Sequence, residues 1–124
     1  MNKEFIPHQQ ALELKELGFD EVCMGGYDLE DNSLYIGYVS NDGIQYNPEY
    51  YTPAPLYQQA FRWFRDEHNW PIEAWIEPHL STNHRKYASK LWTRGEYIEL
   101  GIFDTYEETE LACLKKLIEI VKTK

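Results

Sequence analysis

Residues 87–121 read YASKLWTRGEYIELGIFDTYEETELACLKKLIEIV, and this stretch sets the fold class. Two short segments, 87–92 and 96–102, flank Thr93-Arg94-Gly95, which has the chemistry of a turn. Thr105 and Glu108 then have the spacing of a capping box, in which a hydroxyl and a carboxylate satisfy backbone N–H groups at a helix start. The pattern predicts two strands followed by a long helix.

The apolar residues of this last helix recur every three or four positions, as on the buried face of an amphipathic helix. They are Leu111, Leu114, Leu117, Ile118 and Val121. Acidic residues crowd the first turn and lysines lie later, which matches the helix dipole. We expect the apolar face to pack on the strands.

A second helix is expected in the middle of the chain. Thr52-Pro53-Ala54-Pro55 would open it, because proline is tolerated in a first helical turn. It should end near His68-Asn69, just before Trp70-Pro71. Its apolar face would hold Leu56, Ala60, Phe61, Trp63 and Phe64. A shorter helix is expected over residues 7–17, closed by Gly18 at the position that favours positive φ.

Further strands are expected at residues 33–39 and 72–77, where apolar and polar residues alternate. Ser40-Asn41-Asp42-Gly43 predicts a hairpin turn that leads into residues 44–46. Gly25-Gly26 is interpreted as a turn, because the Lys and Ser or Thr of a phosphate-binding loop are absent. Together these elements predict a single α+β domain over residues 1–124. Two or three helices would pack on a mostly antiparallel sheet of four or five strands.

The composition fits a globular protein, with 43% hydrophobic and 27% charged residues in 124. The net charge of −9 is uneven, since residues 1–50 hold ten acidic residues against Lys3 and Lys15. Such a field repels phosphate backbones and acidic membranes, so we expect no direct nucleic-acid binding and no membrane binding. The acidic half could meet a basic partner, mimic nucleic acid in a basic cleft, or serve only solubility.

The two cysteines, Cys23 and Cys113, form no CxxC pair and are expected to be free thiols in a reducing compartment. The first ten residues, MNKEFIPHQQ, have neither the apolar core of a signal peptide nor a transit pattern. No stretch approaches the roughly 18 apolar residues of a membrane span. A cytoplasmic location is therefore expected.

No motif for catalysis, a cofactor or a metal stands out. Glu77, His79 and His84 lie close in sequence, but the histidine spacing does not share a helical face, and no metal site is expected. The acidic neighbours of Cys23 would raise its pKa, so both cysteines are interpreted as buried hydrophobic residues. The adjacent carboxylates are interpreted as solvated, because acid–base catalysis needs two carboxyls in different environments. An enzyme is the third choice of function.

Aromatic residues make up 15% of the chain, and ten residues are Tyr. The densest run comprises Tyr46, Tyr50, Tyr51, Tyr57, Phe61, Trp63, Phe64, Trp70 and Trp75. These rings cannot all be interior, because a helix buries only part of its circumference. Tyr and Trp favour recognition surfaces, since they offer rigid area and a polar tip. The candidate ligand- or partner-binding residues are Tyr50, Tyr51, Tyr57, Arg62, Arg65, Trp70 and Trp75.

Two binding functions stay open. The first is a non-enzymatic module that engages a protein partner through an aromatic, acidic surface. The second is a binder of a small, nucleotide-like ligand, in which Arg62 and Arg65 pair an anion or stack on a ring. Ordinary salt bridges from these arginines to Asp66, Glu67 or the acidic first half of the chain are the simpler interpretation.

Three stretches resemble a family of small uncharacterised proteins of bacteria and their bacteriophages. They are FIPHQQALELKELGFDE (5–21), LYQQAFRWFRDEHN (56–69) and FDTYEETELACLKKLIEIV (103–121). The resemblance covers most of the chain and implies no catalytic residue and no activity. It implies an accessory protein of a phage or mobile element, and such proteins often bind and block a host factor.

Overall fold

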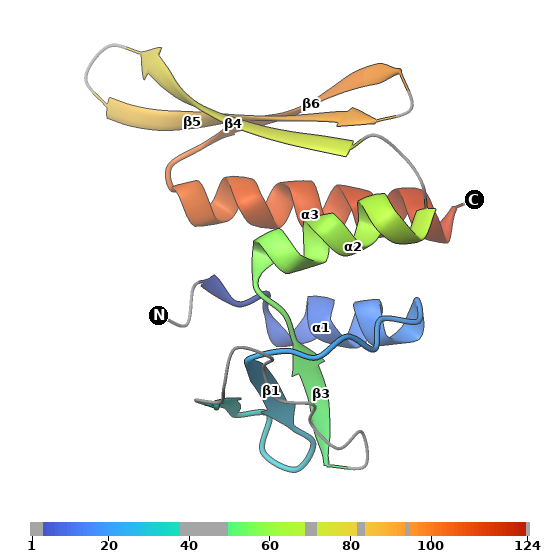
Figure 1. Cartoon of the computed structure of the whole chain (residues 1–124). Coiled ribbons are helices and arrows are strands. Elements are labelled where there is room, and N and C mark those ends of the chain that lie inside the picture. The colour runs from blue at the N-terminus through green and yellow to red at the C-terminus, as the bar shows by residue number, and fades with distance from the viewer. Residues whose placement is uncertain (1–3, 38–49, 69–71, 82–83, 94, 124) are drawn as a thin grey trace. The chain divides into compact units, whose positions relative to one another are not determined.

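The computed structural model describes residues 4–37, 50–68, 72–81, 84–93 and 95–123, without the side chains of 72–81 and 84–86. In chain order the elements are α1 (His8–Glu16), β1 (Gly25–Asp28), β2 (Leu34–Ile36), β3 (Tyr51–Ala54), α2 (Tyr57–His68), β4 (Ile72–Ser81), β5 (His84–Thr93), β6 (Glu96–Phe103) and α3 (Tyr106–Lys122) (Figure 1). The α+β class is confirmed. The prediction of one sheet of four or five strands is wrong, because the described strands form two three-stranded sheets, β2-β1-β3 and β4-β5-β6.

Residues 1–59 and residues 60–124 form two compact units. The first unit contains α1 and the sheet β2-β1-β3, and the second contains the sheet β4-β5-β6 and α3. The boundary between Gln59 and Ala60 falls inside α2. A single domain over the whole chain stays a prediction.

β1 is the central strand of the first sheet and pairs antiparallel with both β2 and β3. The predicted turn at Gly25-Gly26 is therefore wrong, since both glycines lie in this strand. A Cβ atom on Gly25 would lie 2.7 Å from Cε1 of Phe5 and 3.3 Å from the carbonyl oxygen of Ala54. Glycine suits this position because a neighbouring ring approaches the strand backbone closely.

The residues before α2 form a strand and not the start of a helix. Thr52 and Pro53 belong to β3, where Pro53 lies opposite Gly26. Proline is tolerated there because β3 is an edge strand of this sheet among the described residues, and the outer edge needs no ladder hydrogen bond. α2 begins only at Tyr57, later than predicted, and ends at His68, as predicted.

α1 ends as the sequence predicts, with Gly18 at φ +104°. The Gly18 N–H donates to the carbonyl of Lys15 at 3.1 Å, and the Phe19 N–H donates to the carbonyl of Leu14 at 2.9 Å. These two bonds form a Schellman motif, which satisfies the last carbonyls of the helix. Leu14 and Phe19 are both buried, as the apolar pair of this motif usually is.

α3 lies along one face of the second sheet (Figure 1). The predicted helix start is confirmed, because Oγ1 of Thr105 accepts a hydrogen bond from the Glu108 N–H at 3.1 Å. Its buried stripe differs slightly from the prediction, since Leu111 and Val121 are only half-buried. The buried apolar residues are Cys113, Leu114, Leu117 and Ile118. The hydroxyl of Ser89 on β5 donates to the carbonyl of Thr109 at 3.2 Å and so ties the helix to the sheet.

The predicted strands of the second half are confirmed and are longer than expected. β4 extends to Ser81, and β5 already begins at His84. Gly95 has φ +81° in the turn between β5 and β6. In the first half, the strand predicted at 33–39 is present as the shorter β2, while residues 38–39, the turn at 40–43 and the strand at 44–46 lie outside the described residues.

Candidate binding surface

The aromatic run divides into buried and exposed parts. All three rings in the middle of α2, Phe61, Trp63 and Phe64, are buried. Tyr57, in the first turn of α2, is also buried, with 5% of its surface exposed, which leaves little of its ring for a ligand. Tyr50 is the opposite case, since 61% of its surface is exposed. The rings of α2 thus serve packing, whereas Tyr50 presents its ring to solvent.

The other candidate residues are spread over the chain. Arg62 and Arg65 are exposed on α2 and belong to the second unit, whereas Tyr50 and Tyr51 belong to the first. Tyr46 and Trp70 lie outside the described residues, as does the side chain of Trp75. An aromatic–arginine pocket therefore stays a prediction.

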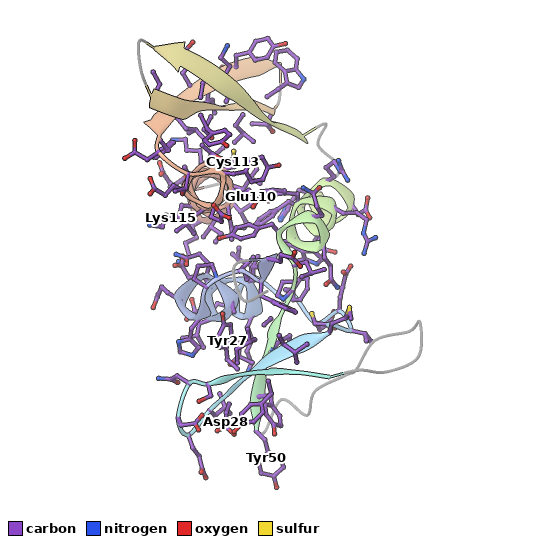
Figure 2. The ribbon with its side chains drawn as sticks, turned by 90° about the vertical axis from the view of Figure 1, so that its left-hand side faces the viewer. Tyr27, Asp28, Tyr50, Glu110, Cys113 and Lys115 are labelled. Carbon is purple, nitrogen blue, oxygen red and sulfur yellow. The ribbon has the colours of Figure 1, made fainter. Side chains whose placement is uncertain are left out.

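Tyrosines and carboxylates that are exposed or half-buried gather at one end of the first sheet. We call this surface the acidic tyrosine patch, and its members are Asp28, Leu29, Glu30, Asp31, Tyr35, Tyr50 and Tyr51. Asp28 and Tyr51 are paired across β1 and β3, and the Leu29 N–H donates to the carbonyl of Tyr50 at 2.9 Å. The rings of Tyr35 and Tyr51 meet edge to face with centroids 6.0 Å apart. Figure 2 shows Asp28 and Tyr50 together at the end of this sheet that lies away from α1.

The loop between β1 and β2 is held by its own side chains. Oδ1 of Asp28 accepts from the Glu30 N–H at 2.7 Å, and Oδ1 of Asp31 accepts from the Ser33 N–H at 2.9 Å. Asn32 has φ +61°, a left-handed conformation that asparagine tolerates better than most residues. These Asx turns fix the position of the carboxylates, so the acidic side of the patch is built into the hairpin.

The negative charge of the patch affects the pKa of Tyr35. The carboxylate of Asp31, followed by partial burial and by Asp28, raises the pKa of Tyr35 above its ordinary value of 10.0. A negative charge nearby disfavours the phenolate, and the phenol is protonated at neutral pH with or without this shift. Tyr35 therefore offers a hydroxyl donor beside carboxylate acceptors. The surface can hold a cationic group by charge and by ring contact at once.

The net charge is distributed unequally between the two units. The first unit holds ten acidic residues against two lysines, whereas the second holds eleven acidic residues against ten lysines and arginines. Nearly all of the net charge of −9 thus lies on residues 1–59. The acidic tyrosine patch lies in the unit with the strong negative field.

The thiols have the burial expected of structural cysteines. Burial, and then the charge of Glu21, raises the pKa of Cys23 to about 12. Burial likewise raises the pKa of Cys113, whose Sγ lies 3.2 Å from the hydroxyl of Ser89. A nucleophilic cysteine needs a lowered pKa, so neither thiol has the properties of a catalytic group.

No group of three His, Cys, Asp or Glu side chains is placed to hold a metal ion within the part of the chain that the structure describes. The side chains of Glu77, His79 and His84 lie outside that part. Among the described helices, none is both long and apolar enough to cross a bilayer.

The sequence alone missed most of the acidic tyrosine patch. Tyr50 and Tyr51 were candidates, but Asp28, Asp31 and Tyr35 were not, because the pairing of β1 with β2 was not predicted. The signal lay in Asp28-Leu29-Glu30-Asp31-Asn32-Ser33, whose Asp and Asn residues are typical of Asx turns. If this run is interpreted as a hairpin loop, it predicts that Tyr35 lies near Asp31.

No family model, curated protein or solved structure matches this chain. The resemblance to a family of bacterial and bacteriophage proteins stays an expectation.

Proposed function

We propose that this chain is a non-enzymatic binding module whose acidic tyrosine patch engages a basic surface of a protein partner. The observation that carries the proposal is the gathering of exposed and half-buried tyrosines and carboxylates at one end of the first sheet, with no Lys or Arg among the patch residues. Blocking of a host factor, which the resemblance implies, is one form that such engagement would take.

The apolar part of the patch supports a macromolecular partner. Tyr50, Tyr35 and Leu29 expose 61%, 47% and 42% of their surfaces. Covering them removes apolar area from water, which contributes about 25 cal/mol per Å². Tyrosine is enriched at interfaces because it brings a large area with few rotatable bonds and a polar tip.

The order of the β1–β2 loop also favours binding. Hydrogen bonds from backbone N–H groups to Asp28 and Asp31 hold the loop before a partner arrives. Association loses less conformational entropy when the contact residues are already placed. The patch is therefore preorganised on its acidic side.

The sign of the charge favours a basic partner. Carboxylates that line a contact surface attract Lys and Arg and speed the encounter with them. The same field repels phosphate groups, which argues against nucleic acid as the partner. A guanidinium or ammonium group can pair with Asp31 while lying against the ring of Tyr35.

A basic peptide probe tests this proposal. We would titrate the intact chain with an arginine- and lysine-rich peptide and follow backbone amides by NMR. A peptide of equal length with Glu at the basic positions serves as the control. We expect the basic peptide alone to shift residues 28–35 and 50–51, and we expect the shifts to weaken as salt rises.

Matched variants locate the contact. Tyr50→Ala should weaken binding about tenfold or more, as for a central aromatic contact. Tyr97→Ala is the control, because Tyr97 lies on β6 in the second unit and is also 61% exposed. A double variant, Glu30→Gln with Asp31→Asn, removes two charges from the patch and should also weaken binding. Its control is the double variant Glu99→Gln with Glu108→Gln in the second unit, which changes the net charge equally and should leave binding unchanged. Equal effects of the two pairs, or shifts that map to the second unit, would refute the proposal.

A further inference from the structure

One face of the second sheet is left uncovered by α3. Along β5, Ser89 and Leu91 are buried on the face that packs on α3, and the hydroxyl of Ser89 donates to the carbonyl of Thr109 in that helix. Side chains alternate between the two faces of a strand, so Lys90 and Trp92 lie on the opposite face. Figure 1 shows α3 on one side of this sheet and no described element of the second unit on the other.

The uncovered face continues onto β6, because residues that are paired across two antiparallel strands share a face. A bulge at Leu100 shifts the register, and Ile102 stays on the uncovered face because it is paired with Ala88. The register pairs Trp92 with Tyr97, Lys90 with Glu99, and Ala88 with Ile102. We call these six residues the outer face.

The outer face is rich in exposed apolar area. Tyr97 and Ile102 expose 61% and 53% of their surfaces, and Trp92 is half-buried. The rings of Trp92 and Tyr97 lie together, with centroids 4.4 Å apart. Neighbouring apolar residues that stay exposed on a folded unit are typical of a contact surface, and Trp and Tyr are enriched in such surfaces.

We propose that the outer face binds the outer face of a second copy of this chain. The two-fold axis would run parallel to the strands, midway between β5 and β6. Such an axis lays each residue of one copy on the residue of the other copy that is its own cross-strand partner. The contacts are Lys90 with Glu99 of the second copy, Trp92 with Tyr97 of the second copy, and Ala88 with Ile102 of the second copy.

A second copy fits this face because each of the three contacts is complementary. The ammonium of Lys90 meets a carboxylate, the ring of Trp92 meets a ring, and the small side chain of Ala88 leaves room for a large one. Each contact occurs twice, as two-fold symmetry requires. The strands of the two copies stay nearly aligned, which is a common way for two sheets to pack face to face.

The charge of the second unit permits this approach. The unit holds eleven acidic residues against ten lysines and arginines, so two such units repel each other little. The dimer does not depend on the proposed function, because the acidic tyrosine patch lies in the first unit. A peptide occupies one patch per chain in the monomer and in the dimer, so Tyr97 and Glu99 remain suitable control positions for the peptide titration.

The size of the outer face sets the strength of the dimer. β5 and β6 are ten and eight residues long. At roughly 3.3 Å per residue and about 4.8 Å between strands, they present a narrow face. Such a face is smaller than the ~800 Å² per partner of a standard interface. We therefore expect a weak dimer that is half-formed at about 0.1–1 mM chain.

Dilution of the intact chain from about 1 mM to about 10 μM tests the proposal by sedimentation velocity and amide NMR. The average mass should rise with concentration toward that of two chains, and the shifts that change with concentration should map to residues 88–92 and 97–102. Tyr97→Ala removes a largely exposed ring, so it should fold, and it should weaken the dimer by about tenfold or more. A chain that stays monomeric throughout would leave this face to another partner and overturn the proposal.

Charge reversal separates contacts between copies from contacts within one chain. Lys90→Glu and Glu99→Lys each place like charges together in their own dimers, and each should weaken self-association by about tenfold or more. An equal mixture of the two variants should regain the dimer, because opposite charges then meet between the copies while each chain keeps its like charges. Lys115→Glu is the matched control, since Lys115 is exposed on α3. A mixture that stays monomeric, or an equal loss in Lys115→Glu, would overturn the proposal.

Discussion

Gly25 is a position in the first unit at which one added carbon should lower stability. A Cβ atom there would overlap the ring of Phe5, because the nearest ring carbon would be only 2.7 Å away. We predict that Gly25→Ala lowers the free energy of unfolding by about 1–3 kcal/mol, the usual cost of overpacking. A denaturant titration followed by circular dichroism measures this change.

Phe5→Leu provides the control for the Gly25 prediction, because it removes the ring atoms that the new Cβ would meet. In the Phe5→Leu background, Gly25→Ala should cost clearly less than in the wild type, and a double-mutant cycle gives the difference. Equal costs in the two backgrounds would mean that Phe5 is not the reason for the glycine.

Tyr35 reports the electrostatics of the acidic tyrosine patch by its own titration. Its pKa is raised chiefly by the carboxylate of Asp31, because a negative neighbour disfavours the phenolate. Asp31→Asn removes that charge and should lower the pKa of Tyr35 toward its ordinary value. A pH titration of ¹³C-labelled tyrosine by NMR would detect the change.

Glu30→Gln is the matched control for Tyr35, since Glu30 adjoins Asp31 but is not among the groups that raise the pKa of Tyr35. This variant should leave the titration of Tyr35 in place. If Asp31→Asn changed the pKa of Tyr35 no more than Glu30→Gln does, Asp31 would not be the main charge acting on Tyr35, and the prediction would be wrong.

Among the elements, α3 depends on a local start signal that can be tested directly. Thr105 accepts the N–H of Glu108 with its hydroxyl. Thr105→Ala should therefore lower the free energy of unfolding by about 1 kcal/mol, a typical cost for losing an N-cap. Thr105→Ser keeps the hydroxyl and should retain most of the stability. Chemical denaturation of the three proteins would decide, and equal stability of Thr105→Ala and the wild type would contradict the prediction.

Two helix ends that depend on local chemistry were predicted from the sequence, whereas β1 and β3, which depend on each other, were not. The Thr105 cap and the Gly18 terminus each involve residues only a few positions apart. β1 and β3 are four residues long, and their Gly25-Gly26 and Pro53 are typical of turns and helix starts. Only pairing with each other makes these segments strands, and no pattern of alternation in one segment encodes its partner.

The candidate site was predicted in part for the same reason. Tyr50 and Tyr51 stood out as a local pair of aromatic residues. Tyr35 joins them only because β2 and β3 flank the same central strand. The aromatic composition therefore predicted Tyr50 and Tyr51, whereas the place of Tyr35 in the acidic tyrosine patch depends on the sheet topology.

For the whole molecule, the division into two units matters for how the chain unfolds. Each unit has about half of the residues, and a domain of roughly 60 residues is only marginally stable by itself. The boundary also falls inside α2, so unfolding either unit breaks that helix. We predict that the chain unfolds in one cooperative transition.

The chain carries separate natural probes for its two units, which makes this last prediction testable without engineered residues. All four tryptophans lie at or after Trp63, in the second unit, while Cys23 is buried in the first. Tryptophan fluorescence and mass spectrometry of thiol labelling at Cys23 should give the same denaturant midpoint, and Cys113 labelling should follow the fluorescence. Labelling of Cys23 at clearly lower denaturant would mean that the first unit opens alone. The acidic tyrosine patch would then rest on a unit that melts independently of α3.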